Sequence, residues 1–148
     1  MDKPKSIMMW RASEKLAHIL TEEYLLGGSN NASLWSLGDK EFDKECSNLD
    51  PGTLVLLFRQ EDSFYYVIGG AYFLRWKSLS VRDAWDLYGV HNGAYNFDDF
   101  VNDIKQRGGN EDSSLSMAQL AHTFIFDTGD VIKLPHELDQ YISERHQF

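Results

Sequence analysis

The chain has 148 residues, 43% of them apolar and 25% charged, which is the composition of a globular protein with one hydrophobic core. Its net charge of −9 excludes generic attraction to nucleic-acid phosphates, although it allows a local basic patch. No apolar run approaches the roughly 20 residues of a membrane helix, the N-terminus lacks the pattern of a signal peptide, and the single Cys46 excludes an intrachain disulfide. These features favour a cytoplasmic protein with no membrane partner.

The N-terminal third is predicted to contain one strand, one helix and a charged segment. Residues 6–11, SIMMWR, indicate a short strand. Residues 13–26 place apolar side chains near helical spacing, with Ser13 as the N-cap. Residues 35–52 alternate acids and bases and end in an Asp-Pro-Gly turn, so we expect this segment on the surface.

The strongest strand signal lies in the middle of the chain. Residues 53–60, TLVLLFRQ, and 64–76, FYYVIGGAYFLRW, are apolar and aromatic runs separated by polar residues, and this pattern predicts a β-hairpin. Gly69 and Gly70 interrupt the second run. Glycine within a strand indicates a bulge or the close approach of another backbone.

The second half is predicted to hold two short helices, capped by Ser80 and Asn96, and then two strands. The predicted ranges are 80–89 and 96–109 for the helices, 117–126 and 130–135 for the strands, and 136–148 for a polar tail. Strands and helices do not alternate strictly. We therefore predict one domain, residues 1–148, with an α+β fold in which a curved mixed sheet or pseudo-barrel is flanked by short helices.

Enzyme signatures are absent from the sequence. There is no phosphate-binding glycine loop, nucleophile elbow or His-Glu-x-x-His motif, and no histidine stands at metal-ligand spacing. Cys46 lies among acids, which disfavour its thiolate, and Asp98 and Asp99 match the N-terminal end of a helix dipole. We predict no catalytic residue, no metal and no cofactor, so that a small enzyme acting on nucleotides is the least supported interpretation.

A basic and aromatic stretch departs from this background. Residues 71–82 contain Arg75, Lys77 and Arg82 and no acid, with several aromatic rings among them. Cations beside exposed rings are typical of a surface that binds nucleic acid. The same residues also fit an ordinary core with a solvated strand edge, and the pattern alone favours this second interpretation.

Several motifs together carry a resemblance to a known family. They are Trp35, the strand at 54–59, Gly-Gly-Ala-Tyr-Phe-Leu-Arg at 69–75, Trp85 through Gly89 to Asn92-Gly93, and the runs 124–126 and 131–135. In this order they resemble the N-terminal domain of a group of bacterial HNH endonucleases of the restriction type. The likeness covers residues 30–135.

The resemblance implies a PUA-like fold, related to the SRA and EVE domains, and a role in restriction–modification and phage defence. Members of this superfamily read 5-methyl- or 5-hydroxymethylcytosine in DNA by flipping the base into an aromatic pocket, a step that costs a few kcal/mol. By this analogy the pocket residues are Trp10, Trp35, Tyr66, Gly69, Gly70 and Tyr72. The phosphate-binding residues are Arg75, Lys77 and Arg82.

The sequence also departs from the family pattern. It contains no His-Asn-His nuclease motif, so a nuclease partner would act in trans or from a missing C-terminal part. Glu61 and Asp62 stand in a region that is rich in lysine in the family, and Tyr65 stands where the family has an asparagine. These acids leave a second hypothesis open, in which the chain is an acidic protein-interaction or DNA-mimic module that does not bind nucleic acid.

Overall fold

The computed structural model describes residues 7–25, 31–61, 64–135 and 142–144. The strands are β1 (Ile7–Arg11), β2 (Ala32–Ser36), β3 (Leu54–Glu61), β4 (Phe64–Ser80), β5 (Ser114–Ile125), β6 (Ile132–Pro135) and β7 (Ile142–Glu144). The helices are α1 (Glu14–Leu25), α2 (Lys40–Ser47), α3 (Val81–Tyr88) and α4 (Phe97–Gln106), with short 3-10 turns η1 (Gly89–Asn92) and η2 (Thr128–Asp130).

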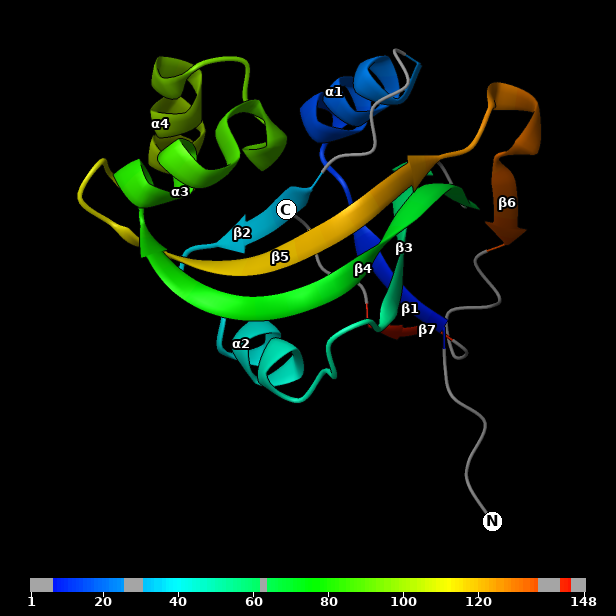
Figure 1. Ribbon diagram of the computed structural model, residues 1–148, viewed down its shortest axis with the longest axis horizontal. Helices are drawn as coiled ribbons and strands as arrows, with labels where there is room; N and C mark the ends of the chain where they lie inside the picture. The colour runs from blue at the N-terminus through cyan, green and yellow to red at the C-terminus, as the bar shows by residue number, and fades with distance from the viewer. Residues whose placement is uncertain (1–6, 26–30, 62–63, 136–141, 145–148) are drawn as a thin grey trace.

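The strands form one mixed sheet in the order β2-β5-β4-β3-β1-β7, and β6 adds to β4. Strand β1 runs parallel to β3 and β7, whereas the other pairs are antiparallel. Within the described residues no pairing joins β2 to β7, so the sheet is curved and open (Figure 1). The predicted α+β fold with a curved mixed sheet is therefore confirmed, and the sheet does not close into a barrel.

Strand β4 is the centre of this sheet. On one side residues 64–72 pair with β3, and on the other residues 64–67 pair with β6 and residues 69–80 with β5. Two irregularities interrupt the pairing with β5, one between Gly70 and Tyr72 and one between Phe73 and Arg75. Because β-bulges bend a strand and increase its twist, they account for the curvature of β4 in Figure 1.

The paired glycines of β4 are explained by close packing. A Cβ atom on Gly69 would lie 2.0 Å from the carbonyl oxygen of Phe124, and one on Gly70 would lie 2.7 Å from the Phe124 ring and 2.9 Å from the carbonyl oxygen of Val55. No side chain fits at such distances. The prediction of a bulge and a close backbone approach at these glycines is confirmed.

The main core packs between the sheet and α2. Trp10 is fully buried, with its ring edge-on to Phe42 at 5.5 Å and to Phe73 at 6.3 Å. Its indole N–H donates to Glu45 Oε1 at 3.0 Å. Since Phe42 and Glu45 belong to α2, this helix is fixed to the sheet by both apolar packing and a hydrogen bond.

The surface prediction for residues 35–52 is wrong in part, because this segment contains the end of β2 and all of α2. Phe42 and Cys46 lie four positions apart and are 0% and 2% exposed. Two apolar residues at this spacing share one face of a helix, and the charged residues around them conceal the pattern. Part of the predicted polar tail is also structured, since β7 pairs with β1; the rest of the tail lies outside the described residues.

The predicted helix starts are confirmed. Ser13 Oγ accepts from the amide of Leu16, Ser80 Oγ from Asp83, and Asn96 Oδ1 from Asp99. Helices α1, α3 and α4 lie on one side of the sheet in Figure 1, and α2 lies on the other. None of the helices in the described part of the chain has the length and apolar character that crossing a bilayer requires.

Candidate functional site

The outer face of β4, opposite the Trp10 core, carries a row of exposed side chains. Phe73 packs in the core and Trp76 packs against it, which defines the inner face. The bulge at this point inserts one extra residue, so the exposed positions change from even to odd numbers along the strand. The exposed residues around the bulge are Tyr72, Leu74, Arg75 and Lys77, and Ser78 and Ser80 are exposed at the end of the strand.

A groove opens where this face meets α3 and η1, and we call it the Arg75 groove. Its volume is about 500 Å³. Arg75 and Gln119 are cross-strand partners on β4 and β5, and Lys77 follows two positions along. The lining residues are Asn31, Arg75, Lys77, Leu87, Tyr88, His91 and Gln119. The groove is therefore mostly polar, and no acid belongs to this lining.

The electrostatics of the Arg75 groove favour an anionic ligand. Within the described residues, neither Arg75 nor Lys77 forms an ion pair with a carboxylate. Burial raises the pKa of Tyr88, and the positive charge of Arg75 opposes this rise. His91, at the rim, forms a hydrogen bond with Glu23 of α1. Two exposed cations thus have no carboxylate partner in the part of the chain that the structure describes, although the net charge of the chain is −9.

A second, smaller hollow of about 150 Å³ lies beside Trp35. The Trp35 indole N–H donates to the carbonyl oxygen of Asn92 at 3.2 Å, and Phe100 meets the ring edge-on at 5.7 Å. The guanidinium of Arg107 lies over the ring, 4.4 Å from its centre, and burial lowers the pKa of Arg107. The lining residues of this Trp35 hollow are Ser13, Lys15, Leu16, Ser33, Leu34, Trp35, Asn92, Gly93, Asp103, Gln106 and Arg107.

Buried Asn92 fixes the turn that borders both hollows. Its Nδ2 donates to the carbonyl oxygens of Ala84 at 2.9 Å and Gly89 at 3.1 Å, and its Oδ1 accepts from Ser33 Oγ at 2.5 Å. Asn92 therefore caps the end of α3 and ties η1 to β2. The resemblance treats Asn92-Gly93 as a motif, and Gly93 provides the left-handed turn with φ of 89°.

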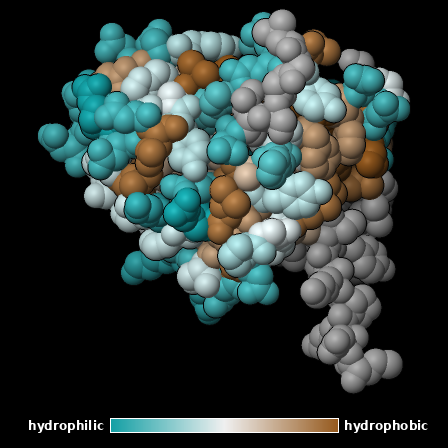
Figure 2. All heavy atoms as spheres, in the orientation of Figure 1, coloured by the Kyte–Doolittle hydropathy of each residue, from teal (hydrophilic) through white to brown (hydrophobic). Residues whose placement is uncertain are grey.

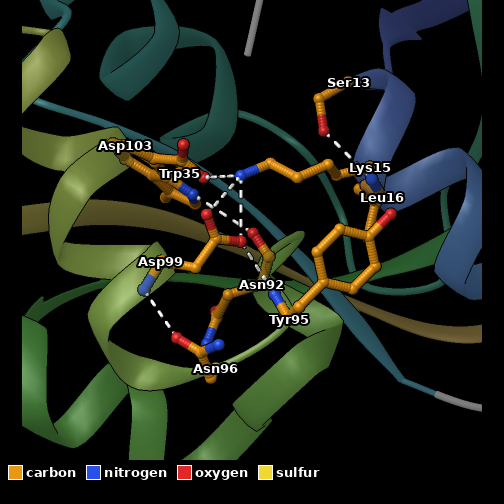
Figure 3. A network of polar contacts seen from close by, with 9 residues as sticks. All are labelled: Ser13, Lys15, Leu16, Trp35, Asn92, Tyr95, Asn96, Asp99 and Asp103. Carbon is orange, nitrogen blue, oxygen red and sulfur yellow. Dashed lines mark hydrogen bonds and ion pairs between the residues drawn. The ribbon is translucent and has the colours of Figure 1, made fainter.

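An ion-pair network joins α1 to α4 beside the Trp35 hollow (Figure 3). Lys15 Nζ contacts Asp99 at 3.0 Å and Asp103 at 2.6 Å. Burial alone would lower the pKa of Lys15, but the hydrogen bonds and charges of Asp103 and Asp99 outweigh it and raise the pKa. The hydrogen bond from the Tyr95 amide, together with Lys15, lowers the pKa of Asp99. Asp99 is thus both a dipole partner of α4, as predicted, and a structural contact.

The structure separates the residues predicted to form one pocket. Trp10 is fully buried in the core, so it presents no face to a ligand. Gly69 and Gly70 are buried between β3 and β5. Tyr66 lies at the β6 end of β4, between Arg59 at 4.7 Å and Lys133 at 6.0 Å from its ring.

Of the predicted phosphate-binding residues, the structure brings Arg75 and Lys77 together, with Tyr72 further along the same face. Arg82 instead lies on α3 over the ring of Phe97, at 4.0 Å. Trp35 borders the separate Trp35 hollow. The predicted residues therefore lie in several separate places. Arg75 and Lys77 line the Arg75 groove and Trp35 lines the Trp35 hollow, whereas Trp10 lies in the core, Tyr66 lies at the β6 end of the sheet and Arg82 lies on α3.

Several site residues could not be found from the sequence. Tyr88, His91 and Gln119 enter the Arg75 groove from α3, η1 and β5, and His91 meets a partner 68 positions away. No local spacing signals such contacts. Gln119 is the exception, because a polar residue inside the apolar strand run 117–126 is a sequence signal that could have marked it as a site residue.

No group of three or more His, Cys, Asp or Glu side chains within the described ranges is arranged to hold a metal ion. Cys46 is buried; burial raises the pKa of its thiol, and Glu45 and Asp43 add to the effect. A comparison with protein-family models and with curated proteins finds no match for this chain.

Proposed function

We propose that this chain is a nucleic-acid-binding module whose phosphate contact is the Arg75 groove. The observation that carries the proposal is a pair of exposed cations, Arg75 and Lys77, which form no ion pair with any carboxylate of the described residues and lie in a polar groove of a strongly acidic chain. An acidic protein gains stability by pairing its cations with nearby carboxylates. Two that remain exposed side by side are suited to an anion supplied from outside.

Phosphates fit this groove better than a single carboxylate would. Arg75 offers a planar fork of donors and Lys77 a mobile point charge, and Gln119 adds a neutral amide between β2 and β4. Leu87 and Tyr88 line the opposite wall, where a sugar or a base edge has apolar surface to contact. Such a combination binds a charged backbone with a flat group attached.

The proposal includes base recognition at the Trp35 hollow. A volume near 150 Å³ is enough to hold one small ring. The lining offers the guanidinium of Arg107, which covers the buried Trp35 ring, as a planar surface for stacking, and Asp103 and Gln106 for hydrogen bonds. In the PUA-like interpretation of the fold, the base is a flipped 5-methyl- or 5-hydroxymethylcytosine of DNA, and a nuclease partner acts on the marked site. Stacking returns about 1–3 kcal/mol per base, which offsets much of the flipping cost.

The groove also bears on the alternative of a DNA mimic. A mimic requires acids on the face that would otherwise contact DNA, whereas the lining of the Arg75 groove contains two cations and no acid. The acids Asp98, Asp99 and Asp103 lie on α4, outside the Arg75 groove, and Asp103 lines the Trp35 hollow. The distribution of charge therefore favours a binder of nucleic acid over a mimic on this face.

Fluorescence anisotropy at low salt tests the proposal. The ligands are labelled DNA oligonucleotides, duplex and single-stranded, that contain cytosine, 5-methylcytosine or 5-hydroxymethylcytosine. We expect the double variant Arg75→Gln and Lys77→Gln to lose binding to all of them, and Arg82→Gln, which removes a charge elsewhere, to keep it. Retained binding in the double variant would refute the groove as the phosphate site.

The base pocket is tested by filling it. Gln106 is exposed and lines the Trp35 hollow, so Gln106→Trp blocks the hollow without removing a core contact. We expect this variant to abolish discrimination between modified and unmodified cytosine while it retains the affinity that the phosphates supply. If the parent protein shows no discrimination, or if the blocked variant discriminates equally, the Trp35 hollow is not the base pocket.

A further inference from the structure

The outer face of β4 continues beyond the Arg75 groove as an exposed aromatic and apolar surface. Tyr72 is 41% exposed, Leu74 37% and Leu54, the cross-strand partner of Tyr72 on β3, 45%. Figure 2 shows hydrophobic and hydrophilic side chains interleaved over the middle of the molecule, where β4 and β5 run in Figure 1. Tyr72 thus presents a large part of its ring to solvent.

The Tyr72 ring packs against a pair of phenylalanine rings. The centres of the Tyr72 and Phe124 rings are 6.5 Å apart, and the centres of the Phe124 and Phe126 rings are 5.7 Å apart. Gly70 leaves room for Phe124 to pack against the β4 backbone, since a Cβ there would meet the ring at 2.7 Å. The two bulges of the β4–β5 pair flank Tyr72 on either side. Bulges commonly re-aim a side chain at a functional surface, and here they separate the Tyr72 ring from the Arg75 groove by a bend.

The spacing along β4 suits a short stretch of nucleic-acid strand. At about 3.3 Å per residue, Tyr72 lies about 10 Å from Arg75 and about 17 Å from Lys77 along the strand. A backbone that contacts both cations therefore needs only a few nucleotides to bring a base over Tyr72. A tyrosine ring stacks any base by its face, so this contact carries no sequence requirement.

We infer that the ligand of this face is a single-stranded segment of nucleic acid laid along β4, with its phosphates at Arg75 and Lys77 and one unpaired base stacked on Tyr72. The inference rests on the proposed function and specifies the ligand of the Arg75 groove. A duplex keeps the faces of its bases inside its own stack, and it offers Tyr72 a base only after paying to unpair it. The charge complementarity of the two cations favours this occupant over an apolar peptide.

Competition between strand forms provides the test. Labelled 12-nucleotide single strands of DNA and RNA are titrated beside the duplex of the same sequence, with the parent protein, three tyrosine variants, and the single variants Arg75→Gln and Lys77→Gln. Tyr72→Ala removes the ring, Tyr72→Phe keeps it, and Tyr95→Ala removes another exposed tyrosine, which is 52% exposed at the start of α4. Circular dichroism confirms that each variant is folded.

We expect the parent protein to bind a single strand more tightly than the duplex. Tyr72→Ala weakens single-strand binding by about 5- to 150-fold, the range that one stacked base supplies, whereas Tyr72→Phe and Tyr95→Ala change it by less than about 3-fold. The dependence of log K on log salt falls by about 0.7 for each of Arg75→Gln and Lys77→Gln, the value for one phosphate contact on a single strand.

The outcomes separate the inference from the proposal beneath it. Equal affinity for the two strand forms, or full affinity in Tyr72→Ala, with binding still dependent on Arg75 and Lys77, overturns the β4 platform and leaves the proposed function intact. Absence of binding to every nucleic acid at low salt overturns both.

Discussion

Asn92 offers the sharpest test of how the region between the two hollows is built. It is 3% exposed and its side chain makes three hydrogen bonds, to Ser33, Ala84 and Gly89. A net contribution of about 1 kcal/mol for each bond gives a loss of about 3 kcal/mol in the free energy of unfolding for Asn92→Ala. For a chain of this size that loss lowers Tm by about 6–12 °C.

Urea unfolding followed by far-UV circular dichroism measures this loss, with Asn96→Ala as the matched control. Asn96 caps α4 at the surface through one bond to the Asp99 amide, and its removal costs about 1 kcal/mol. Asn92→Asp keeps the shape and the acceptor for Ser33, but it turns a charged oxygen toward two carbonyl oxygens. We expect it to destabilise the protein at least as much as Asn92→Ala.

A loss below about 1 kcal/mol for Asn92→Ala, equal to that of the control cap, would refute the reasoning. It would mean that water replaces the three bonds and that η1 is not fixed by this side chain. The turn between the Arg75 groove and the Trp35 hollow would then not be fixed. The proposal that one binds phosphates and the other a base would lose its structural basis.

Three further predictions follow from contacts described above. Gly69→Ala places a Cβ atom 2.0 Å from the carbonyl oxygen of Phe124, so we expect a loss of more than about 3 kcal/mol; near-normal urea unfolding would contradict this. The pKa of Asp99 is lowered below 3.8, so its stabilisation is present above that pH and is lost as the pH falls through the folded-state pKa. The acid-induced loss of stability should be smaller in Asp99→Asn, and identical acid titrations of the two proteins would show that the pair with Lys15 does not contribute. The Cys46 thiol, buried and with a raised pKa, should react with iodoacetamide only when urea unfolds the protein, and rapid labelling in its absence would contradict the packing of α2.

The sequence was sufficient where a signal is local. The hairpin of β3 and β4, the caps at Ser13, Ser80 and Asn96, and the bulge at the paired glycines all depend on neighbouring residues, and all are confirmed. The α+β class and the mixed sheet followed from the order of elements, but the order did not decide between an open sheet and a pseudo-barrel. The pairing of β1 with β3 in parallel could not be read in this way, because it depends on which distant strands meet.

The candidate site was predicted only in part for the same reason. Arg75 and Lys77 share a strand face and a lack of nearby acids, and both properties are visible in the sequence. Trp10 and Trp35 look alike as residues, yet one is enclosed by the core and the other borders a hollow. Burial of that kind is decided by α2 and α4, elements far along the chain, and periodicity does not encode it.

The central position of β4 has a consequence for binding. Residues 64–72 of β4 have hydrogen-bonded strands along both edges and exchange their amide protons only when the sheet opens, so this part of β4 should be among the slowest-exchanging segments of the protein. Tyr72 lies at the end of this doubly paired part, whereas Arg75 and Lys77 follow on a stretch that, among the described strands, pairs with β5 alone; all three are still mounted on sheet backbone, so a ligand that docks there mainly orders their side chains. Preorganisation of this kind leaves more of the contact energy for affinity.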